Sequence, residues 1–301
     1  MNVFDRRLVR RHRDRAAGHF EHHDFLVREV AERLAERLDD VTREFPCALD
    51  LGCHTGGLAA VLGDRGAVET LIQSDLSAAM ARLAATNGRP TLVADEELLP
   101  FAPESFDLVM SVLSLHWVND LPGTLIQIGR CLKPDGLFLA ALLGGGTLGQ
   151  LRAALLQAEI EVEGGASPRV SPFLDLRDAG ALLQRAGFAL PVADRDVITV
   201  DYPDALTLMA DLRAMGEANA LEDRRRTPSR RATLLRAAAL YQELHGRDDG
   251  RLPVTFDVIY LTAWAPHASQ PKPLRPGSAT HRLAEALDTR ELPTGDTVKP
   301  K

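Results

Sequence analysis

The chain has 301 residues, of which 45% are hydrophobic and 26% are charged, and its formal net charge is −7 at pH 7. This composition is ordinary for a globular protein with a sizeable core, and the acidic balance gives no general attraction to nucleic acid or anionic membranes. The three cysteines, Cys47, Cys53 and Cys131, lack paired or metal-ligand spacing, and no stretch approaches the ~20 apolar residues of a membrane span. We therefore expect a cytoplasmic protein without a transmembrane segment.

The N-terminal region combines a basic run with a predicted amphipathic helix. The run "RRLVRRHRDR" (6–15) is rich in arginine and favours a solvated helix face, although it could also bind an acidic partner or RNA. Histidines in "HFEHHD" (19–24) would share one helix face, but no distant ligand is evident, so we expect no metal site. Apolar residues at four-residue steps then predict a helix over 25–38 that Asp24 caps.

Short apolar strands alternate with helical segments between about 48 and 143. Strands are expected at 47–53, 70–76, 91–95, 106–115 and 137–143. Ser77 should cap one intervening helix, which Asn87-Gly88 should end, and Asp120 should cap another. Because the strands are apolar on both faces and β-α-β units repeat, the sequence predicts a doubly wound α/β fold with a mostly parallel sheet.

The remaining chain predicts helical additions and two further strands, the last one antiparallel. Thr147 should cap a helix that begins at 148, and Thr227 with Pro228 should start one that runs to 246. Other helices are expected at 175–188 and 204–219, and strands at 197–202 and 254–265. The predicted divisions are an N-terminal helical cap (1–45), an α/β core (46–145), a capping insertion with the sixth strand (146–250), the last core strand (251–266) and a largely disordered tail (267–301).

Acidic residues end three successive strands of the predicted sheet. Asp50 precedes a turn with Gly52 and Gly56, Asp75 ends the second strand, and Asp95-Glu96 ends the third. The carboxyl ends of parallel strands meet at one edge of the sheet, and glycine lets a ligand approach the backbone there. These acids are therefore expected to line one binding site.

The chemistry of this edge favours a nucleoside with a positive centre. Asp75 can accept hydrogen bonds from both ribose hydroxyls, Leu76 can pack on an adenine, and Asp95 and Glu96 can accept from its amino group. The turn lacks the lysine of a phosphate-binding loop, and Asp50 would repel a pyrophosphate. S-adenosylmethionine (SAM), which carries a sulfonium and an ammonium, therefore fits better than NAD.

His54 stands inside the glycine-rich turn and leaves two interpretations open. With a negative φ it would point away from the ligand, and its ring would hydrogen-bond the loop. With a positive φ it would cost ~1 kcal/mol of strain and weaken ligand binding. We favour the negative φ because the other features of the site are intact.

The order of these motifs, followed by "FDLVMSVLSLHW" and "LKPDGLF", resembles the class I SAM-dependent methyltransferases. "MNVFDRRLVRR", "EGGASPRVSPF" and "DLRAMGEANA" are similar to the methyltransferase-like assembly factors of respiratory complex I, and the chain more loosely resembles malonyl-carrier-protein methyltransferase of biotin synthesis. The resemblance implies that Asp50, Gly52, Cys53 and Gly56 surround the methionine part of SAM, that Asp75, Leu76, Asp95 and Glu96 contact its adenosine, and that Ser111 and Leu113 line the pocket.

The same resemblance implies a SAM-dependent methyltransferase that acts on a protein during complex I assembly. The partner would be a peripheral-arm subunit, with no nucleic acid involved, in the cytoplasm or at the inner face of the respiratory membrane. His116 would be a general base or a substrate contact; the alternative is that it only packs at the start of a helix. Trp117 would stack on a ligand or belong to the core. An arginine hydroxylase, a malonyl-carrier-protein O-methyltransferase and a binding-only chaperone remain alternatives.

Overall fold

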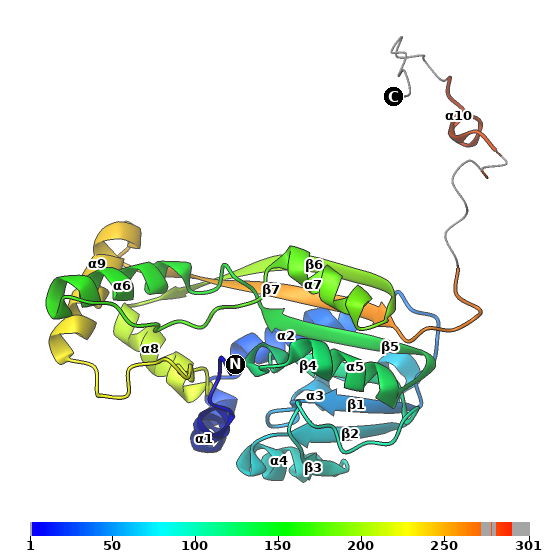
Figure 1. The fold of residues 1–301 in the computed structure, drawn as a ribbon, viewed down its shortest axis with the longest axis horizontal. Helices are drawn as coiled ribbons and strands as arrows, with labels where there is room; N and C mark the ends of the chain where they lie inside the picture. Colours follow the sequence, from blue (N-terminus) through cyan, green and yellow to red (C-terminus); the bar gives the residue numbers. More distant parts are fainter. Residues whose placement is uncertain (1, 272–277, 279–280, 291–301) are drawn as a thin grey trace. The chain divides into compact units, whose positions relative to one another are not determined.

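A seven-stranded sheet organises the main unit of the protein, Met1–Pro266. The computed structural model describes residues 2–271, 278 and 281–290. The strands are β1 (Cys47–Leu51), β2 (Thr70–Asp75), β3 (Thr91–Val93), β4 (Phe106–Val112), β5 (Leu132–Leu143), β6 (Ala189–Tyr202) and β7 (Leu252–Trp264). Their order is β3-β2-β1-β4-β5-β7-β6, with β1 to β5 parallel and β7 antiparallel to both of its neighbours (Figure 1). The predicted doubly wound, mostly parallel fold is confirmed.

The strand order places a natural crevice at the carboxyl end of β1. The chain leaves β1 toward β2 on one side, whereas β4 pairs with the other side of β1. In open α/β sheets such a reversal separates the two flanking connections, and ligands bind in the resulting crevice. The turn after Asp50 lies at this point.

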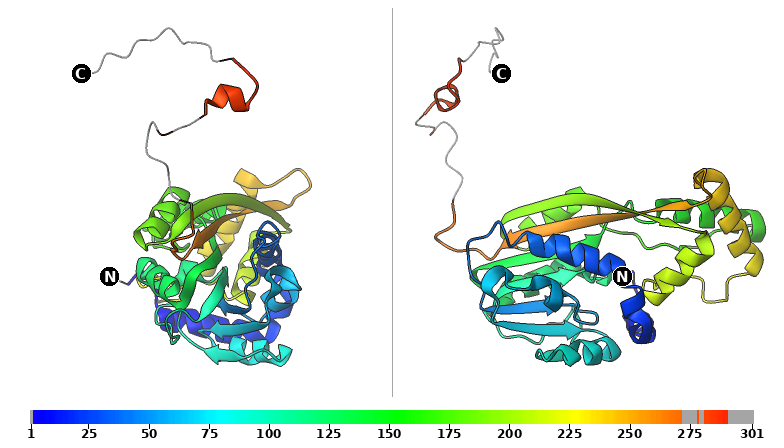
Figure 2. Two further views of the ribbon diagram at one scale, coloured as in Figure 1. Left: turned by 90° about the vertical axis from the view of Figure 1, so that its right-hand side faces the viewer. Right: turned by 180° about the vertical axis from the view of Figure 1, so that it is seen from behind.

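Helices cover both faces of the sheet because successive residues of its strands point to opposite sides. Ala48 and Leu108 belong to the apolar cluster under α2 (Phe25–Glu36) and α3 (Leu58–Leu62), and the adjacent Leu49 and Val109 belong to the cluster under α5 (Leu121–Cys131) and α7 (Leu176–Arg185). Figure 1 shows α5 and α7 on the near face, and the right-hand view of Figure 2 shows α2 on the opposite face. Alternation of side-chain direction in each strand produces these two layers.

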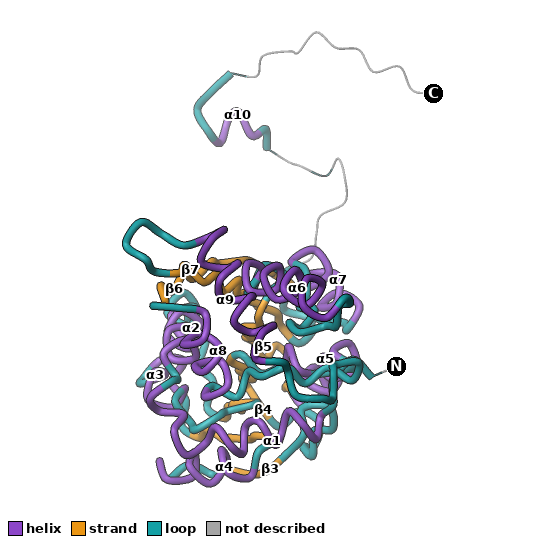
Figure 3. The backbone as a smooth tube through the Cα atoms, turned by 90° about the vertical axis from the view of Figure 1, so that its left-hand side faces the viewer, coloured by secondary structure: helices purple, strands orange, loops and turns teal. Residues whose placement is uncertain are grey.

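A helical cap lies across the carboxyl end of the sheet. It consists of α1 (Arg6–Ala16), α6 (Gly149–Glu163), α8 (Ala205–Ala214) and α9 (Arg231–His245), which stand in front of the strands in Figure 3. The strands β5 and β7, with 12 and 13 residues, are much longer than β1 with 5 residues. Residues of β7 near its start, such as Phe256, share an apolar cluster with α6, α8 and α9, so the cap and the sheet have one continuous core.

The smaller elements are short helical turns. They are α4 (Ala78–Ala84), α10 (Leu283–Ala286) and the 3₁₀ helices η1 (Ala17–His22), η2 (Arg65–Ala67), η3 (Ala85–Asn87) and η4 (Leu115–Trp117). The second unit, His267–Lys301, has α10 in its described part. The prediction of a disordered tail falls largely on 272–277, 279–280 and 291–301, which lie outside the described residues. Within the part of the chain that the structure describes, no helix is long and apolar enough to span a membrane.

Two of the predicted helix caps are confirmed. The Ser77 hydroxyl accepts from Met80 N at 3.1 Å, and the Asp120 carboxylate accepts from Gly123 N at 2.9 Å. Gly88 has φ +79° and ends the helical segment that includes η3, as expected of a left-handed C-terminal residue.

Three other predicted caps are wrong, because two of the side chains have other partners and the third helix begins later than predicted. The Asp24 carboxylate binds Arg28 and makes no cap bond. The Thr147 hydroxyl donates to Asp257 O at 2.9 Å and accepts from Asp257 N at 3.0 Å, which fixes the loop to β7. Helix α9 begins at Arg231, so Thr227 and Pro228 precede it.

Strands β5 and β6 begin earlier than predicted. β5 starts at Leu132 and passes through Asp135, whose φ is +62°, instead of starting after a turn. β6 starts at Ala189, although its first half contains a proline and aspartates that are uncommon in strands. An edge strand tolerates such residues, since one of its sides has no strand partner, and β6 pairs with β7 along most of its length.

Candidate cofactor and substrate site

The turn after β1 has a backbone shape that only glycine fits at two positions. Gly52 has φ +74°, and a Cβ there would lie 2.0 Å from Ser114 Oγ. Gly56 has φ +83°, and a Cβ there would lie 2.6 Å from Gln73 Nε2. Both glycines are therefore required for the turn itself, in addition to any ligand contact.

Asp50 presents an unsatisfied carboxylate oxygen beside this turn. It is 1% exposed, and its Oδ2 has no hydrogen-bond partner among the described residues. Burial, together with the nearby charge of Asp75, raises the pKa of Asp50 to about 8. A buried carboxyl of this kind is a vacant position for a cationic or hydrogen-bond-donating group.

A small cavity of about 260 Å³ opens at Asp50. The turn contributes Gly52, Cys53 and His54 to its wall, and the opposite wall comes from η1 and α2, including Phe20 and Val27. Cys53 is buried, and burial raises the pKa of its thiol, so Cys53 is a neutral wall residue. The structure thus brings the predicted turn residues and the N-terminal region together around one space.

His54 adopts the conformation that the sequence interpretation did not favour. Its φ is +50°, whereas a negative φ was expected. The backbone N–H donates to Asp75 Oδ2 at 3.1 Å, and Nε2–H donates to the carbonyl of Val112 at 3.1 Å. The ring also stacks on Phe20, with centroids 5.3 Å apart and planes 10° apart. These contacts hold the left-handed backbone in place, and the ring closes one side of the small cavity.

The acids at the ends of β2 and β3 are paired with an arginine from α1. Arg13 donates to Asp75 at 3.3 Å, to Glu96 at 3.0 Å and to Ser114 Oγ at 2.9 Å, and it is only 2% exposed. Burial alone would lower the pKa of Arg13, but Asp75 and Glu96 raise it above the usual value for arginine. Burial would likewise raise the pKa of Glu96, but Arg13 and Arg6 hold it well below the usual range. Glu96 is therefore ionised, and Arg13 of α1 supplies a positive partner for both acids.

Arg6, about two helical turns before Arg13 in α1, completes this ion cluster. It pairs with Asp95 and Glu96 and donates to the carbonyl of Trp117 at 3.2 Å. The expectation of a solvated basic face is thus wrong for Arg6 and Arg13, because the acidic partner lies within the same chain. Other arginines of the run, such as Arg15, remain exposed.

Two predicted pocket residues have other immediate contacts. Leu76 packs in a cluster with Phe4, Val9 and Trp117, so α1 and the N-terminal residues cover it. The Ser111 hydroxyl donates to the carbonyl of Leu51 at 2.7 Å and lines neither the small cavity nor the larger one described next. The bond joins β4 to β1, which is a structural role that its strand-end position did not reveal.

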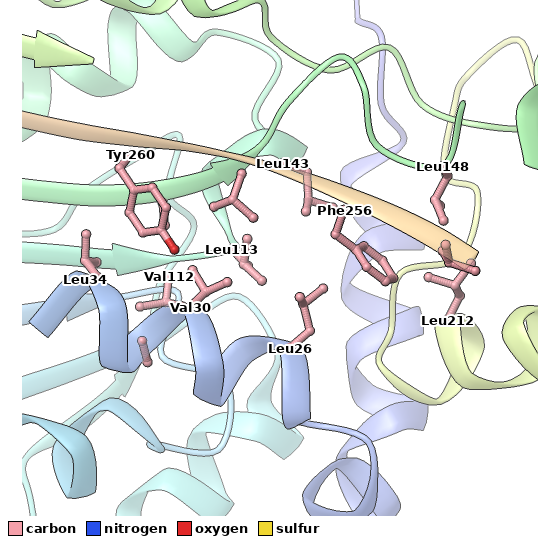
Figure 4. Packing of buried hydrophobic residues seen from close by; sticks show 14 of the residues in the cluster. Leu26, Val30, Leu34, Val112, Leu113, Leu143, Leu148, Leu212, Phe256 and Tyr260 are labelled. Atoms are coloured by element: carbon pink, nitrogen blue, oxygen red, sulfur yellow. The ribbon is translucent and has the colours of Figure 1, made fainter. Parts of the chain in front are cut away.

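A larger cavity of about 420 Å³ lies between the sheet and the cap. Leu113, just after β4, is part of its wall, and Val27 borders both this cavity and the small one. Figure 4 shows Leu26 of α2, Phe256 of β7 and Leu212 of α8 around this region. Its apolar lining includes Leu26, Leu113, Leu143, Leu148, Leu212 and Phe256. A volume of this size is typical of a site for a small molecule or for a long side chain.

His116 and Trp117 meet a carboxylate that sequence reasoning missed. His116 Nε2 donates to Glu217 Oε2 at 3.1 Å, and Trp117 Nε1 donates to Oε2 at 3.1 Å and to Oε1 at 3.2 Å. Trp117 and Glu217 line the larger cavity, whereas His116 is behind them and contacts the ring of Phe173. His116 is thus connected to the cavity through Glu217.

Comparisons with known proteins show which family the chain belongs to. Residues 49–140 match the family model described as a methyltransferase domain. Arginine-hydroxylase NDUFAF5 from Danio rerio is 45% identical over 95% of this chain and 89% of its own length, and that of Homo sapiens is 45% identical over 95% and 83%. Malonyl-[acyl-carrier protein] O-methyltransferase from Methylovorus sp. is 40% identical over 88% of this chain and 91% of its own length. The chain belongs to this SAM-dependent methyltransferase family.

Solved structures support the fold of this methyltransferase at low sequence identity. The YcgJ protein of Bacillus subtilis superimposes with a TM-score of 0.54 at 15% identity and covers 78% of this chain and 98% of its own. A putative methyltransferase of Haloferax volcanii, in complex with the activator Trm112, also gives 0.54, at 20% identity, over 87% of this chain and 100% of its own. Both match most of the methyltransferase chain.

SAM is the cofactor of this methyltransferase family, and the residues present fit it. The orphaned Oδ2 of Asp50 suits an ammonium group, and Gly52 lines the small cavity beside it without a side chain. Asp75 and Glu96 are buried acceptors at the neighbouring strand ends. All these groups belong to the sites that the sequence predicted.

Of the two functional residues that were missed, Arg13 had a signal in the sequence and Glu217 had none. Arg13 lies on the same face of α1 as Val9 and Ala16, which are buried. Glu217 follows Met215 and Gly216 in a loop with no regular period, so its position beside Trp117 is decided only by the tertiary structure.

Proposed function

We propose that this protein binds SAM at the ends of β1, β2 and β3 and methylates a side chain of another protein during assembly of respiratory complex I. The observation that carries the proposal is the small cavity at Asp50, which shares Val27 with a larger cavity enclosed by the cap. One cavity suits the methionine part of the cofactor, and the other suits an acceptor side chain. The similarity to NDUFAF5 over 95% of the chain supports the assembly role.

The predicted site residues have distinct roles in this proposal. Asp50 would hold the ammonium of SAM, and the turn of Gly52, Cys53 and Gly56 would surround its methionine part. Asp75 would accept from the ribose, while Asp95 and Glu96 would face the adenine, with Leu76 against its ring. Leu113, whose side chain lines the larger cavity, would separate the cofactor from the acceptor, and Ser111 would support the wall from behind.

Methyl transfer requires little of the protein beyond placement and proton removal. When bound, SAM would supply a methyl group that is activated by its bond to a positively charged sulfur. The chain must hold the acceptor in line with that bond, exclude water and take up the acceptor's proton. The apolar wall of the larger cavity would keep water from the acceptor, and Glu217, which accepts from His116, would take up the acceptor's proton.

A second candidate activity is hydroxylation of an arginine side chain. The observation that favours it is the 45% identity to NDUFAF5 proteins that are named arginine-hydroxylases. The partner would in either case be a peripheral-arm subunit, and the protein would act in the cytoplasm or at the inner face of the respiratory membrane.

Calorimetry of SAM binding tests the cofactor site. Asp75→Asn keeps the size of the side chain but removes the charge that accepts from the ribose. We expect the affinity for SAM to fall about 10- to 100-fold, because a hydrogen bond to a charged group contributes about 1.5–3 kcal/mol. Asp64→Asn, at an exposed acid beyond α3, is the control and should bind like the wild type. Equal affinity of Asp75→Asn and the wild type would remove this site.

Mass spectrometry of complex I subunits, with and without the gene for this protein, tests the reaction. A gene-dependent methyl group on a peripheral-arm subunit supports methyl transfer, and a gene-dependent oxygen on an arginine supports hydroxylation instead. If neither modification depends on the gene while SAM binding is intact, the proposed enzyme activity is contradicted. The protein would then be a binding-only chaperone.

A further inference from the structure

Glu217 is the sole carboxylate among the described residues that line the larger cavity. It lies in the loop after α8, and both of its oxygens face donors from η4, the Trp117 indole and the His116 ring. Trp117 also borders the cavity, and Leu113 connects this wall to the end of β4. Trp117 packs against Leu76 just after β2, so Glu217 lies on the wall of the cavity that adjoins the predicted adenosine contacts.

Glu217 is charged and has acceptor capacity left over. Burial would raise the pKa of Glu217, but His116 and Trp117, with Arg13 nearby, hold it below the usual value, so the group is ionised at neutral pH. A carboxylate offers about four acceptor positions, and the two ring N–H groups cannot fill them all. An ionised carboxylate beside an apolar cavity is stabilised most by a cationic donor that fills its remaining acceptor positions.

The basic residues around the same cavity do not form a competing site for an anion. Three of them are already paired, since Arg169 donates to Glu159, Arg224 to Asp5 and Arg225 to Glu163. Burial lowers the pKa of His12, so its ring is neutral at pH 7. Arg213, the remaining one, is exposed to solvent. The charge that faces the interior of the cavity is thus the negative charge of Glu217.

We propose that Glu217 is the specificity-determining residue of the acceptor site and selects a guanidinium or ammonium group carried on an aliphatic stem. The apolar wall would hold the stem, and the carboxylate would accept hydrogen bonds from the cationic end beside the cofactor. A carboxylate acceptor, such as the malonyl group of a carrier protein, would be repelled at this position. This inference rests on the proposed function and narrows its substrate to basic side chains.

A pair of probes with the same shape tests the charge selection. N-acetyl-arginine methylamide and N-acetyl-citrulline methylamide differ mainly in the charge of the end group, and their affinity for the full chain in the presence of SAM is measured by calorimetry. The wild type should prefer the arginine probe about 10- to 100-fold, the effect of one hydrogen bond to a charged group. A lysine probe distinguishes an ammonium site from a guanidinium site.

Variants at position 217 then assign the preference to this side chain. Glu217→Gln keeps an oxygen for Trp117 but removes the charge, and it should lose the arginine preference while citrulline binding stays the same. Glu217→Asp keeps the charge and should retain part of the preference. Glu222→Gln is the matched control, because Glu222 is in the same loop, pairs with Arg226 and does not line the cavity. A thermal melt of each variant checks folding.

The outcomes separate this inference from the proposed function. A wild type without an arginine preference, or a Glu217→Gln variant that keeps it, overturns the role of Glu217. SAM binding in Glu217→Gln should equal that of the wild type, so a loss of probe selection alone supports an acceptor site. Failure of the wild type to bind SAM contradicts the proposed function, whatever the probes show.

Discussion

Asp50 illustrates how one buried acid changes the energetics of a site. Its carboxyl is 1% exposed, and one oxygen has no partner in the part of the chain that the structure describes. Burial favours the neutral form, and the adjacent Asp75 adds repulsion, so the pKa rises to about 8. The group is therefore mostly protonated at pH 7, although its unfolded counterpart is ionised.

Binding of SAM at pH 7 should release close to one proton from Asp50. The ammonium of SAM favours the ionised carboxylate, which moves the pKa of Asp50 down from about 8 to below the working pH. Calorimetry in two buffers that differ in ionisation enthalpy measures this release, and the Asp50→Asn variant should show none. Binding without proton release in the wild type would contradict the ion pair between Asp50 and the ammonium.

His54 shows that a strained backbone position can be supported by its own side chain. Its φ of +50° costs about 1 kcal/mol relative to an extended residue. The ring is buried, bonds to the Val112 carbonyl and stacks on Phe20, and these contacts stabilise the conformation. The histidine is part of the cavity wall, so it shapes the site instead of pointing away from it.

Helix α1 is the element that couples the N-terminus to the predicted cofactor site. Arg13 binds Asp75, Glu96 and Ser114, and Arg6 binds Asp95 and Glu96. Asp75 and Glu96, which the sequence assigns to the adenosine, are thus neutralised from within the chain. Entry of the cofactor therefore requires these ion pairs to open or to rearrange.

The Arg13→Met variant should bind SAM faster than the wild type but be less stable without it. Removing one partner of a buried ion pair costs about 3–5 kcal/mol, because Asp75 and Glu96 lose their counter-charge. The same change removes the ion pairs that must open before SAM enters, so we expect the association rate of SAM to rise about tenfold. Thermal unfolding and stopped-flow fluorescence measure the two effects.

Arg15→Met is the control for this experiment, because Arg15 is exposed on the same helix. It should leave both the melting temperature and the association rate unchanged. Slower association in Arg13→Met would show that Arg13 helps to bind the cofactor instead of occupying its site.

The main unit of the molecule contains every apolar cluster that the structure describes. These clusters begin at Phe4 and end at Ala265, and the seven strands lie between those limits. The long strands β5 and β7 carry the core from the sheet into the cap, which encloses the larger cavity. The stability of the unit therefore depends on packing between segments that are far apart in the sequence.

A chain that ends at Pro266 should fold and bind SAM like the full-length protein. The reason is that the sheet, the four clusters and the residues around both cavities precede this position. Differential scanning calorimetry and SAM titration of the shortened and full-length chains check the expectation. A marked fall in melting temperature or in SAM affinity would show that residues 267–301 stabilise the main unit.

The sequence by itself determined the sheet, its mostly parallel direction and the acids at its strand ends. These features depend on local patterns: apolar runs of strand length, glycine turns, and the caps at Ser77 and Asp120. It misjudged three caps: Asp24 pairs with Arg28 of its own helix, Thr147 binds β7, and α9 begins after Thr227, at Arg231. It also missed the first half of β6, which is held by its pairing with β7.

Only the tertiary structure decided which charges meet. Arg13 and Asp75 are 62 residues apart, and Trp117 and Glu217 are 100 residues apart, so no local period connects them. The positive φ of His54 likewise depends on Phe20 and Val112, which other elements supply. A strand-end acid can be recognised from its own neighbours in the chain, whereas its counter-charge depends on how helices and loops pack across the sheet. The chain's pattern therefore locates the site, and the packing of the cap determines its electrostatics.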